Sequence, residues 1–60
     1  MNANELKSIR KKLGLSISEA SVQVRITPRS WARYESGERR IPEGVVELFF
    51  LKNNLKYEAK

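Results

Sequence analysis

Four residues that begin or end helices divide this sixty-residue chain into short segments. Gly14 and Gly37 favour the left-handed backbone conformation that ends a helix, whereas Pro28 and Pro42 fit the first turn of one. No stretch shows the alternation of apolar and polar residues that is typical of a half-buried strand. We therefore expect an all-α fold of four to five short helices, built as the single domain that this length allows.

Local capping signals predict where the helices begin. Asn2 with Glu5, and Ser16 with Glu19, have the spacing of capping boxes, in which each side chain binds the backbone N–H of the other residue. Thr27 stands before a proline and can cap a third helix. The helices expected from these signals cover residues 3–13, about two turns after Ser16, residues 28–35, and a segment that starts at Pro42 and ends at Asn53-Asn54.

The composition argues against several classes of function. The chain has no Cys, His or Asp, so it lacks disulfides, thiolate metal ligands and most catalytic bases. We therefore expect no enzyme, no metal site, no cofactor and no small-molecule ligand. No apolar run approaches the roughly 20 residues of a membrane-spanning helix, and the N-terminus has no signal-peptide layout, so a cytoplasmic protein without a membrane partner is expected.

The positive charge is concentrated in the first two thirds of the chain. Residues 1–40 hold nine Lys and Arg against four Glu, whereas residues 41–60 hold three of each sign. Such a segment favours a polyanionic partner, either a nucleic acid or a membrane surface. A membrane-bound peptide would need one continuous amphipathic helix, which the prolines and glycines break. Nucleic acid is therefore the expected partner.

The second and third expected helices are separated by residues 25–27 alone. A turn this short sets two helices at a large angle, as in a helix-turn-helix. On the third helix Arg29, Ser30 and Arg33 share the exposed face, while Trp31 and Tyr34 point into the core. Two guanidinium groups one turn apart suit the major groove, where each can bind guanine O6 and N7 together. This face is expected to contact the bases.

The fourth expected helix is apolar on more than one side. One side, formed by Val45, Leu48 and Phe49, can complete the core, which leaves Val46, Phe50 and Leu51 for a partner. Because a single recognition helix reads few bases, we expect a homodimer through this helix and the 53–60 tail. The alternative is an antitoxin-type interaction module, which binds a protein through the same surface and binds DNA as well.

Several short motifs at matching spacing resemble the Cro/C1-type (XRE) helix-turn-helix family over about residues 4–50, with the helix-turn-helix itself near 16–36. The motifs are Leu13-Gly14-Leu15-Ser16, Glu19-Ala20, Tyr34-Glu35-Ser36-Gly37 and Ile41-Pro42. Ser18-Glu19-Ala20 and Arg29-Ser30-Trp31 further resemble the N-terminal domain of some anti-CRISPR-associated repressors. The resemblance implies a Cro/C1 repressor-like fold and a regulator of transcription, a phage-like repressor that binds double-stranded DNA in the bacterial nucleoid or the phage-infected host cytoplasm.

The resemblance also implies roles for individual residues. Base contacts fall on Arg29, Ser30 and Arg33 of the third helix. An ion pair between Arg10 and Glu35 is expected to join the first helix to the end of the third. Phosphate contacts are expected at the starts of helices and in the loop after the third helix, from Ser16, Thr27, Ser36, Arg39 and Arg40.

Three positions depart from the family pattern. Ile17 replaces a Gln that anchors phosphate, so one polar contact is missing. Arg25 stands where the family has the turn Gly, and a left-handed conformation at a residue with a side chain costs about 1–2 kcal/mol. Pro28 occupies a position that often reads bases, so base contacts are expected to begin at Arg29.

Overall fold

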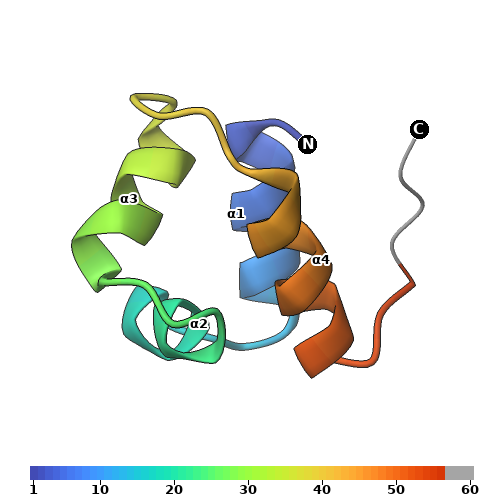
Figure 1. Ribbon diagram of the computed structural model, residues 1–60. Helices are drawn as coiled ribbons and strands as arrows, with labels where there is room; N and C mark the ends of the chain where they lie inside the picture. Colours follow the sequence, from blue (N-terminus) through green and yellow to red (C-terminus); the bar gives the residue numbers. More distant parts are fainter. Residues whose placement is uncertain (57–60) are drawn as a thin grey trace.

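The first three helices begin directly after the capping residues that the sequence predicted, and the fourth begins one residue after Pro42, which has no side-chain cap bond. In the computed structural model, which describes residues 1–56, both capping boxes are formed, and the side chain of Thr27 accepts a hydrogen bond from the backbone N–H of Ser30 at the start of the third helix. The fold is all-α, as expected (Figure 1). The described helices are α1 (Ala3–Lys12), α2 (Ile17–Gln23), α3 (Pro28–Ser36) and α4 (Glu43–Lys52).

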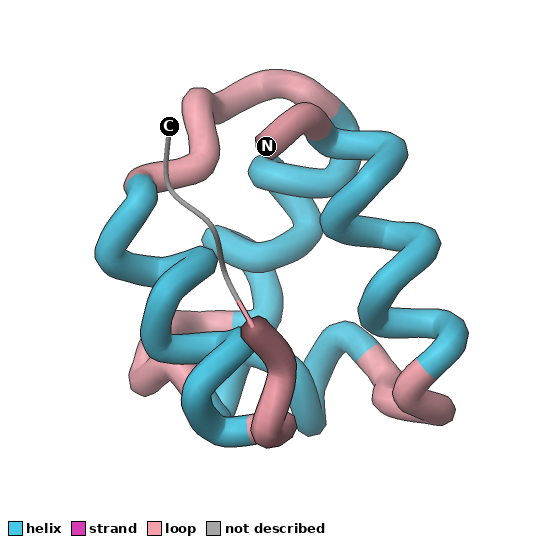
Figure 2. Tube along the Cα trace, turned by 90° about the vertical axis from the view of Figure 1, so that its right-hand side faces the viewer, coloured by secondary structure: helices cyan, strands magenta, loops and turns pink. Residues whose placement is uncertain are grey.

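The helix ends are equally local in origin. Gly14 follows Leu13, the C-cap of α1, and Gly37 caps α3; both have positive φ (72° and 83°). α4 ends in a turn in which Asn54 is left-handed (φ 56°). Residues 53–56 therefore do not continue as a helix. The remainder of the expected 53–60 tail, residues 57–60, lies outside the described residues. The connections between helices are short (Figure 2).

α3 packs against both α1 and α2, whereas α4 packs chiefly against α2. In Figure 1, α3 and α4 stand on opposite sides of the molecule, α1 lies between them and α2 runs beneath. The buried rings of Trp31 in α3 and Phe49 in α4 contact each other edge to face, with 5.0 Å between the ring centroids. The buried apolar residues are Leu6, Ala20, Val24, Trp31, Tyr34, Val46, Phe49 and Phe50.

α4 buries more of its surface than the sequence analysis assigned to the core. Val46 and Phe50, which were expected to stay exposed for a partner, are only 2% and 9% exposed in the single chain. The expectation was wrong because the segment is apolar on several sides, and a helix that enters between its neighbours buries more than one of them. Leu51 is the exception, since 73% of its surface is exposed. None of the helices in residues 1–56 is long and apolar enough to cross a membrane.

Candidate nucleic-acid interface

The turn between α2 and α3 sets the position of the side of α3 that carries Arg29, Ser30 and Arg33, which we call the recognition face because the sequence predicts base contacts there. The N–H of Ile26 donates to the carbonyl of Ser21 (3.0 Å) and the N–H of Arg25 to that of Val22 (3.1 Å), which is the Schellman arrangement of a helix end. This arrangement requires a left-handed residue, and Arg25 supplies it with φ 58°. The chain thus keeps the family's turn without its glycine, and it stores backbone strain there.

The first turn of α3 presents two linked hydroxyls. Thr27 Oγ1 accepts a hydrogen bond from the backbone N–H of Ser30 (3.1 Å) and donates one to Ser30 Oγ (3.0 Å). Thr27 is exposed and Ser30 half-buried. Ser30 Oγ keeps its own hydrogen for a further acceptor. The predicted phosphate contact at Thr27 and base contact at Ser30 are therefore placed side by side at the start of the helix.

The two arginines of α3 lie along its exposed side and line one shallow hollow with Ala32, Ser36 and Glu38. Arg29 is exposed and makes no hydrogen bond or ion pair within residues 1–56. Arg33, one turn later, has a side chain that is 36% exposed, and its Nε lies 3.6 Å from Glu38 Oε2. Both guanidinium groups are thus available to a partner that approaches this side of α3.

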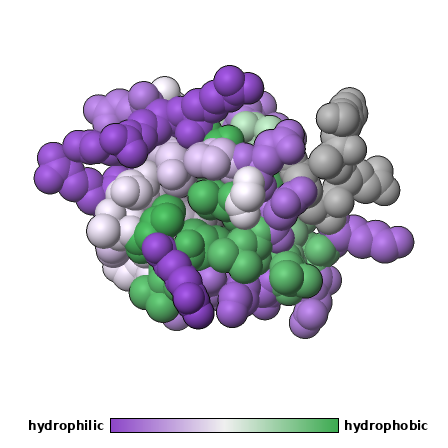
Figure 3. Space-filling model, viewed as in Figure 1, coloured by the Kyte–Doolittle hydropathy of each residue, from purple (hydrophilic) through white to green (hydrophobic). Residues whose placement is uncertain are grey.

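The loop after α3 folds back onto the last turn of the helix. Ser36 Oγ donates to the carbonyl of Arg33 (3.0 Å), and the N–H of Arg39 donates to the same carbonyl (3.3 Å). Arg39 and Arg40 are exposed, so their charges lie beside the end of α3. In the space-filling view, hydrophilic side chains extend from this upper-left part of the molecule, while apolar side chains gather lower on the same face (Figure 3).

A buried ion pair connects α3 to α1. Arg10 Nε lies 2.6 Å from Glu35 Oε2, Arg10 Nη2 donates to Oε1 (3.1 Å), and Nη1 donates to the carbonyl of Leu15 (2.8 Å). The indole N–H of Trp31 donates to the same carboxylate. The side chains of Arg10 and Glu35 are 11% and 7% exposed. This network joins α1, α3 and the connection after α1.

The network also determines the ionisation of Glu35. Burial alone would raise the pKa of Glu35, but the hydrogen bonds from Arg10 and Trp31, together with the positive charges of Arg10 and Lys7, outweigh burial and lower it. The hydrogen bond to Glu35 raises the pKa of Arg10 in turn, against the opposing effect of burial. Glu35 is therefore a charged carboxylate whose oxygens are held by Arg10 and Trp31.

Ser16 stands at the start of α2 with its polar groups already bonded. Its N–H donates to Glu19 Oε1 (2.8 Å), and its Oγ accepts from the N–H of Glu19 (3.1 Å). The hydrogen bond from the Ser16 backbone N–H to the carboxylate, with a smaller contribution from the Ser16 side chain, lowers the pKa of Glu19, so its carboxylate stays charged at this helix start. A phosphate that contacts Ser16 has to share the site with Glu19, and that contact stays a prediction.

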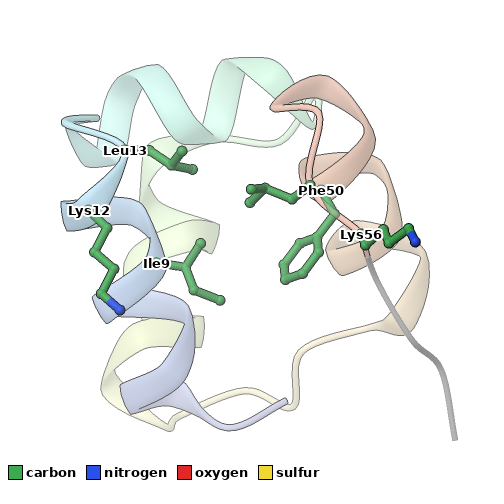
Figure 4. A pocket seen from close by; sticks show the side chains of 6 residues that line it. Ile9, Lys12, Leu13, Phe50 and Lys56 are labelled. Carbon is green, nitrogen blue, oxygen red and sulfur yellow. The ribbon is translucent and has the colours of Figure 1, made fainter.

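A second surface feature lies between α1 and the C-terminal end of α4. An apolar pocket is lined by Ile9 and Leu13 from α1 and by Phe50 and Leu55 from the α4 end, with Lys12 and Lys56 at its edge. Ile9, Leu13 and Phe50 point into the space between the two helices, whereas the amino groups of the two lysines point away from it (Figure 4). We call this the α1–α4 pocket.

Sequence reasoning missed one residue at the recognition face. Glu38 was counted only as a charge, but the fold brings its carboxylate to Arg33. The signal was an acidic residue directly after the glycine that ends α3, because a left-handed residue turns the chain back toward the last helical turn. This pattern predicts that the acidic residue lies near the last turn of α3, but it does not predict which side chain of that turn its carboxylate contacts.

Comparison with known proteins identifies the arrangement. Residues 3–50 match the family model described as a helix-turn-helix domain. The chain is 44% identical over 46 residues to the Aca2 repressor of Pectobacterium phage ZF40; the match covers 75% of this chain and 40% of that repressor. No solved structure matches the chain. Both resemblances inferred from the motifs, to the Cro/C1-type family and to an anti-CRISPR-associated repressor, are thereby confirmed, and they point to a regulator rather than an enzyme.

Proposed function

This chain belongs to the helix-turn-helix domain family, and we propose that it is a transcriptional repressor that binds specific sequences in double-stranded DNA. The observation that carries the proposal is the exposed side of α3, where Arg29 and Arg33 stand one turn apart beside a loop with two further arginines. The similarity to a phage repressor supports the direction of regulation. A protein of this kind acts on the DNA of a bacterial or phage-infected cytoplasm.

The proposed docking places α3 in the major groove. An α-helix fits this groove, and an arginine fork can bind guanine O6 and N7 with two parallel hydrogen bonds. Arg29, Ser30 and Arg33 are the base-contacting residues in this arrangement. The phosphates flanking the groove are assigned to polar groups at helix starts and in the α3–α4 loop, namely Ser16, Thr27, Ser36, Arg39 and Arg40. To donate to a phosphate, the hydroxyls of Thr27 and Ser36 exchange the bonds that they donate to Ser30 Oγ and to the carbonyl of Arg33.

The proposed regulator acts as a homodimer, since two copies of α3 in successive major grooves read about twice as many bases. With Val46 and Phe50 in the core, the dimer surface moves to Leu51 and the neighbouring α1–α4 pocket. Leu51 is exposed and directly follows Phe50, which lines that pocket. An exposed leucine and an apolar pocket on one chain can form the self-complementary contact of a two-fold interface. The comparisons give no support to the antitoxin alternative.

Selection of bound duplexes from a random pool, at stated salt, tests the function directly. A repeated motif with two-fold symmetry is expected. Arg29→Ala and Arg33→Ala should each relax the preference at particular base pairs and weaken specific binding by about 1–3 kcal/mol. Lys11→Ala is the matched control, because Lys11 is an exposed cation of α1 that is assigned no DNA contact. If both arginine variants select the wild-type motif with wild-type discrimination, α3 does not read the bases.

A further inference from the structure

The carboxylate next to Arg33 has a role that the helix-turn-helix assignment leaves open. Resting on the proposed function, we propose that Glu38 is a positioning residue, which holds the Nε side of the Arg33 guanidinium and thereby restricts Arg33 to guanine. The juxtaposition that carries this is the 3.6 Å separation between Arg33 Nε and Glu38 Oε2 on the recognition face.

Three hydrogen bonds, two of them made by the Ser36 hydroxyl, fix the loop around Glu38 relative to α3. Ser36 Oγ donates to the carbonyl of Arg33 (3.0 Å) and accepts from the N–H of Glu38 (3.4 Å). Gly37 turns the chain with φ 83°, and the N–H of Arg39 returns to the carbonyl of Arg33 (3.3 Å). The residues on both sides of Glu38 are thus tied to the last turn of α3, so its backbone stays near Arg33.

The position of the carboxylate determines which donors of Arg33 remain. A guanidinium has five N–H donors in a rigid fork. With Nε facing Glu38, the two Nη groups at the end of the fork are left for the partner, and their spacing suits guanine O6 and N7. An arginine without such a neighbour can turn toward a phosphate, which adds affinity but no sequence information. The charge of Glu38 also repels phosphate and so opposes that alternative.

α3 contains its own comparison. Arg29 lies on the same helix and in the same hollow, yet it has no ion-pair partner within residues 1–56. Removal of Glu38 should therefore change base discrimination where Arg33 reads and leave it unchanged where Arg29 reads. A merely structural role for Glu38 in the loop predicts no such difference between two positions of the same site.

The test compares Glu38→Gln with wild type on single-base variants of the selected operator. Arg33→Ala first identifies the base pair that Arg33 reads. Glu38→Gln should reduce discrimination at that base pair about tenfold, as expected when an arginine–guanine pair loses its preferred geometry, with little change elsewhere. Its affinity for non-specific DNA should rise, because one negative charge is removed. The double variant Arg33→Ala/Glu38→Gln should discriminate no worse than Arg33→Ala alone.

Glu47→Gln is the control for charge, since Glu47 is an exposed residue of α4 whose side chain makes no hydrogen bond or ion pair within residues 1–56. It should raise non-specific affinity without changing discrimination at any base pair. If Glu38→Gln behaves like Glu47→Gln on a clear motif, Glu38 does not position Arg33. If wild type selects no motif at all, the proposed function itself fails, so the two failures are distinguishable.

Discussion

Arg25 holds a backbone conformation that residues with side chains rarely adopt, with φ 58° in the turn between α2 and α3. Its neighbours make both hydrogen bonds of a Schellman end, so the turn cannot relax without losing them. Arg25 is exposed and has no side-chain partner within residues 1–56. Nothing in its side chain offsets the strain in the free protein.

Arg25→Gly should therefore stabilise the domain. Glycine removes the cost of the left-handed conformation, which is about 1–2 kcal/mol. Its greater conformational freedom in the unfolded chain lowers the stability of the fold by about 0.5–1 kcal/mol, which offsets part of this gain. A net gain of about 0.5–1 kcal/mol is expected in the free energy of unfolding, measured by urea titration. Val22→Gly, at an exposed helical position, should instead lose about 0.5 kcal/mol, the difference between the helix propensities of Val and Gly. A loss at both positions would show that the Arg25 turn is unstrained.

Glu35 makes the fold sensitive to acid. Its pKa is lowered in the folded chain, so the unfolded chain takes up the proton first as the pH falls. The stabilisation is complete above the ordinary value of 4.5 and is lost as the pH falls through the lower folded pKa. Thermal unfolding should show the melting temperature falling over that interval.

Glu35→Gln checks the assignment of this acid sensitivity. At neutral pH it should cost about 3–5 kcal/mol, because the buried guanidinium of Arg10 loses its counter-charge. It should also remove part of the acid-dependent loss of stability, whereas Glu47→Gln should leave that loss intact. An unaltered acid profile in Glu35→Gln would mean that other carboxylates produce it.

At the scale of elements, the sequence determined helix starts well because caps depend on residues three apart. The bonds of Asn2, Ser16 and Thr27 are formed as their spacing predicted. The buried sides of α4 could not be read in this way, since its apolar run does not encode which neighbours surround it. The Arg33–Glu38 contact was equally hidden, because it depends on the path of the loop after Gly37.

Two adjacent residues of α4 should respond oppositely to truncation. Phe50 is buried, so Phe50→Ala should cost about 3–5 kcal/mol of stability through lost packing and a cavity. Leu51 is exposed, so Leu51→Ala should stay within about 0.5 kcal/mol in the monomer. Chemical denaturation at low protein concentration measures both. Equal effects at the two positions would contradict the described orientation of α4.

The whole molecule combines a small core with a large positive charge. Eight buried apolar residues hold the described part of the chain together, while sixty residues carry a formal net charge of +5. That charge attracts DNA and repels a second copy of the chain. The net positive charge therefore favours the proposed binding of DNA through α3 and opposes the proposed association with a second copy through α4.

Salt should accordingly weaken DNA binding and strengthen self-association. Counterion release makes the logarithm of DNA affinity fall with the logarithm of salt, by a slope of about 0.9 for each phosphate contacted, and Arg39→Ala should reduce that slope. The proposed dimer would bury Leu51 and the α1–α4 pocket near Lys12 and Lys56, so screening of like charges should lower its dissociation constant.

Sedimentation without DNA, at low and high salt, measures the second effect. Leu51→Glu should abolish the dimer, whereas Val22→Glu, at a similarly exposed position of α2, should not. A wild-type dimer that dissociates as salt is added would have to be held by ion pairs between copies, and the apolar surface beside α4 would not be its interface.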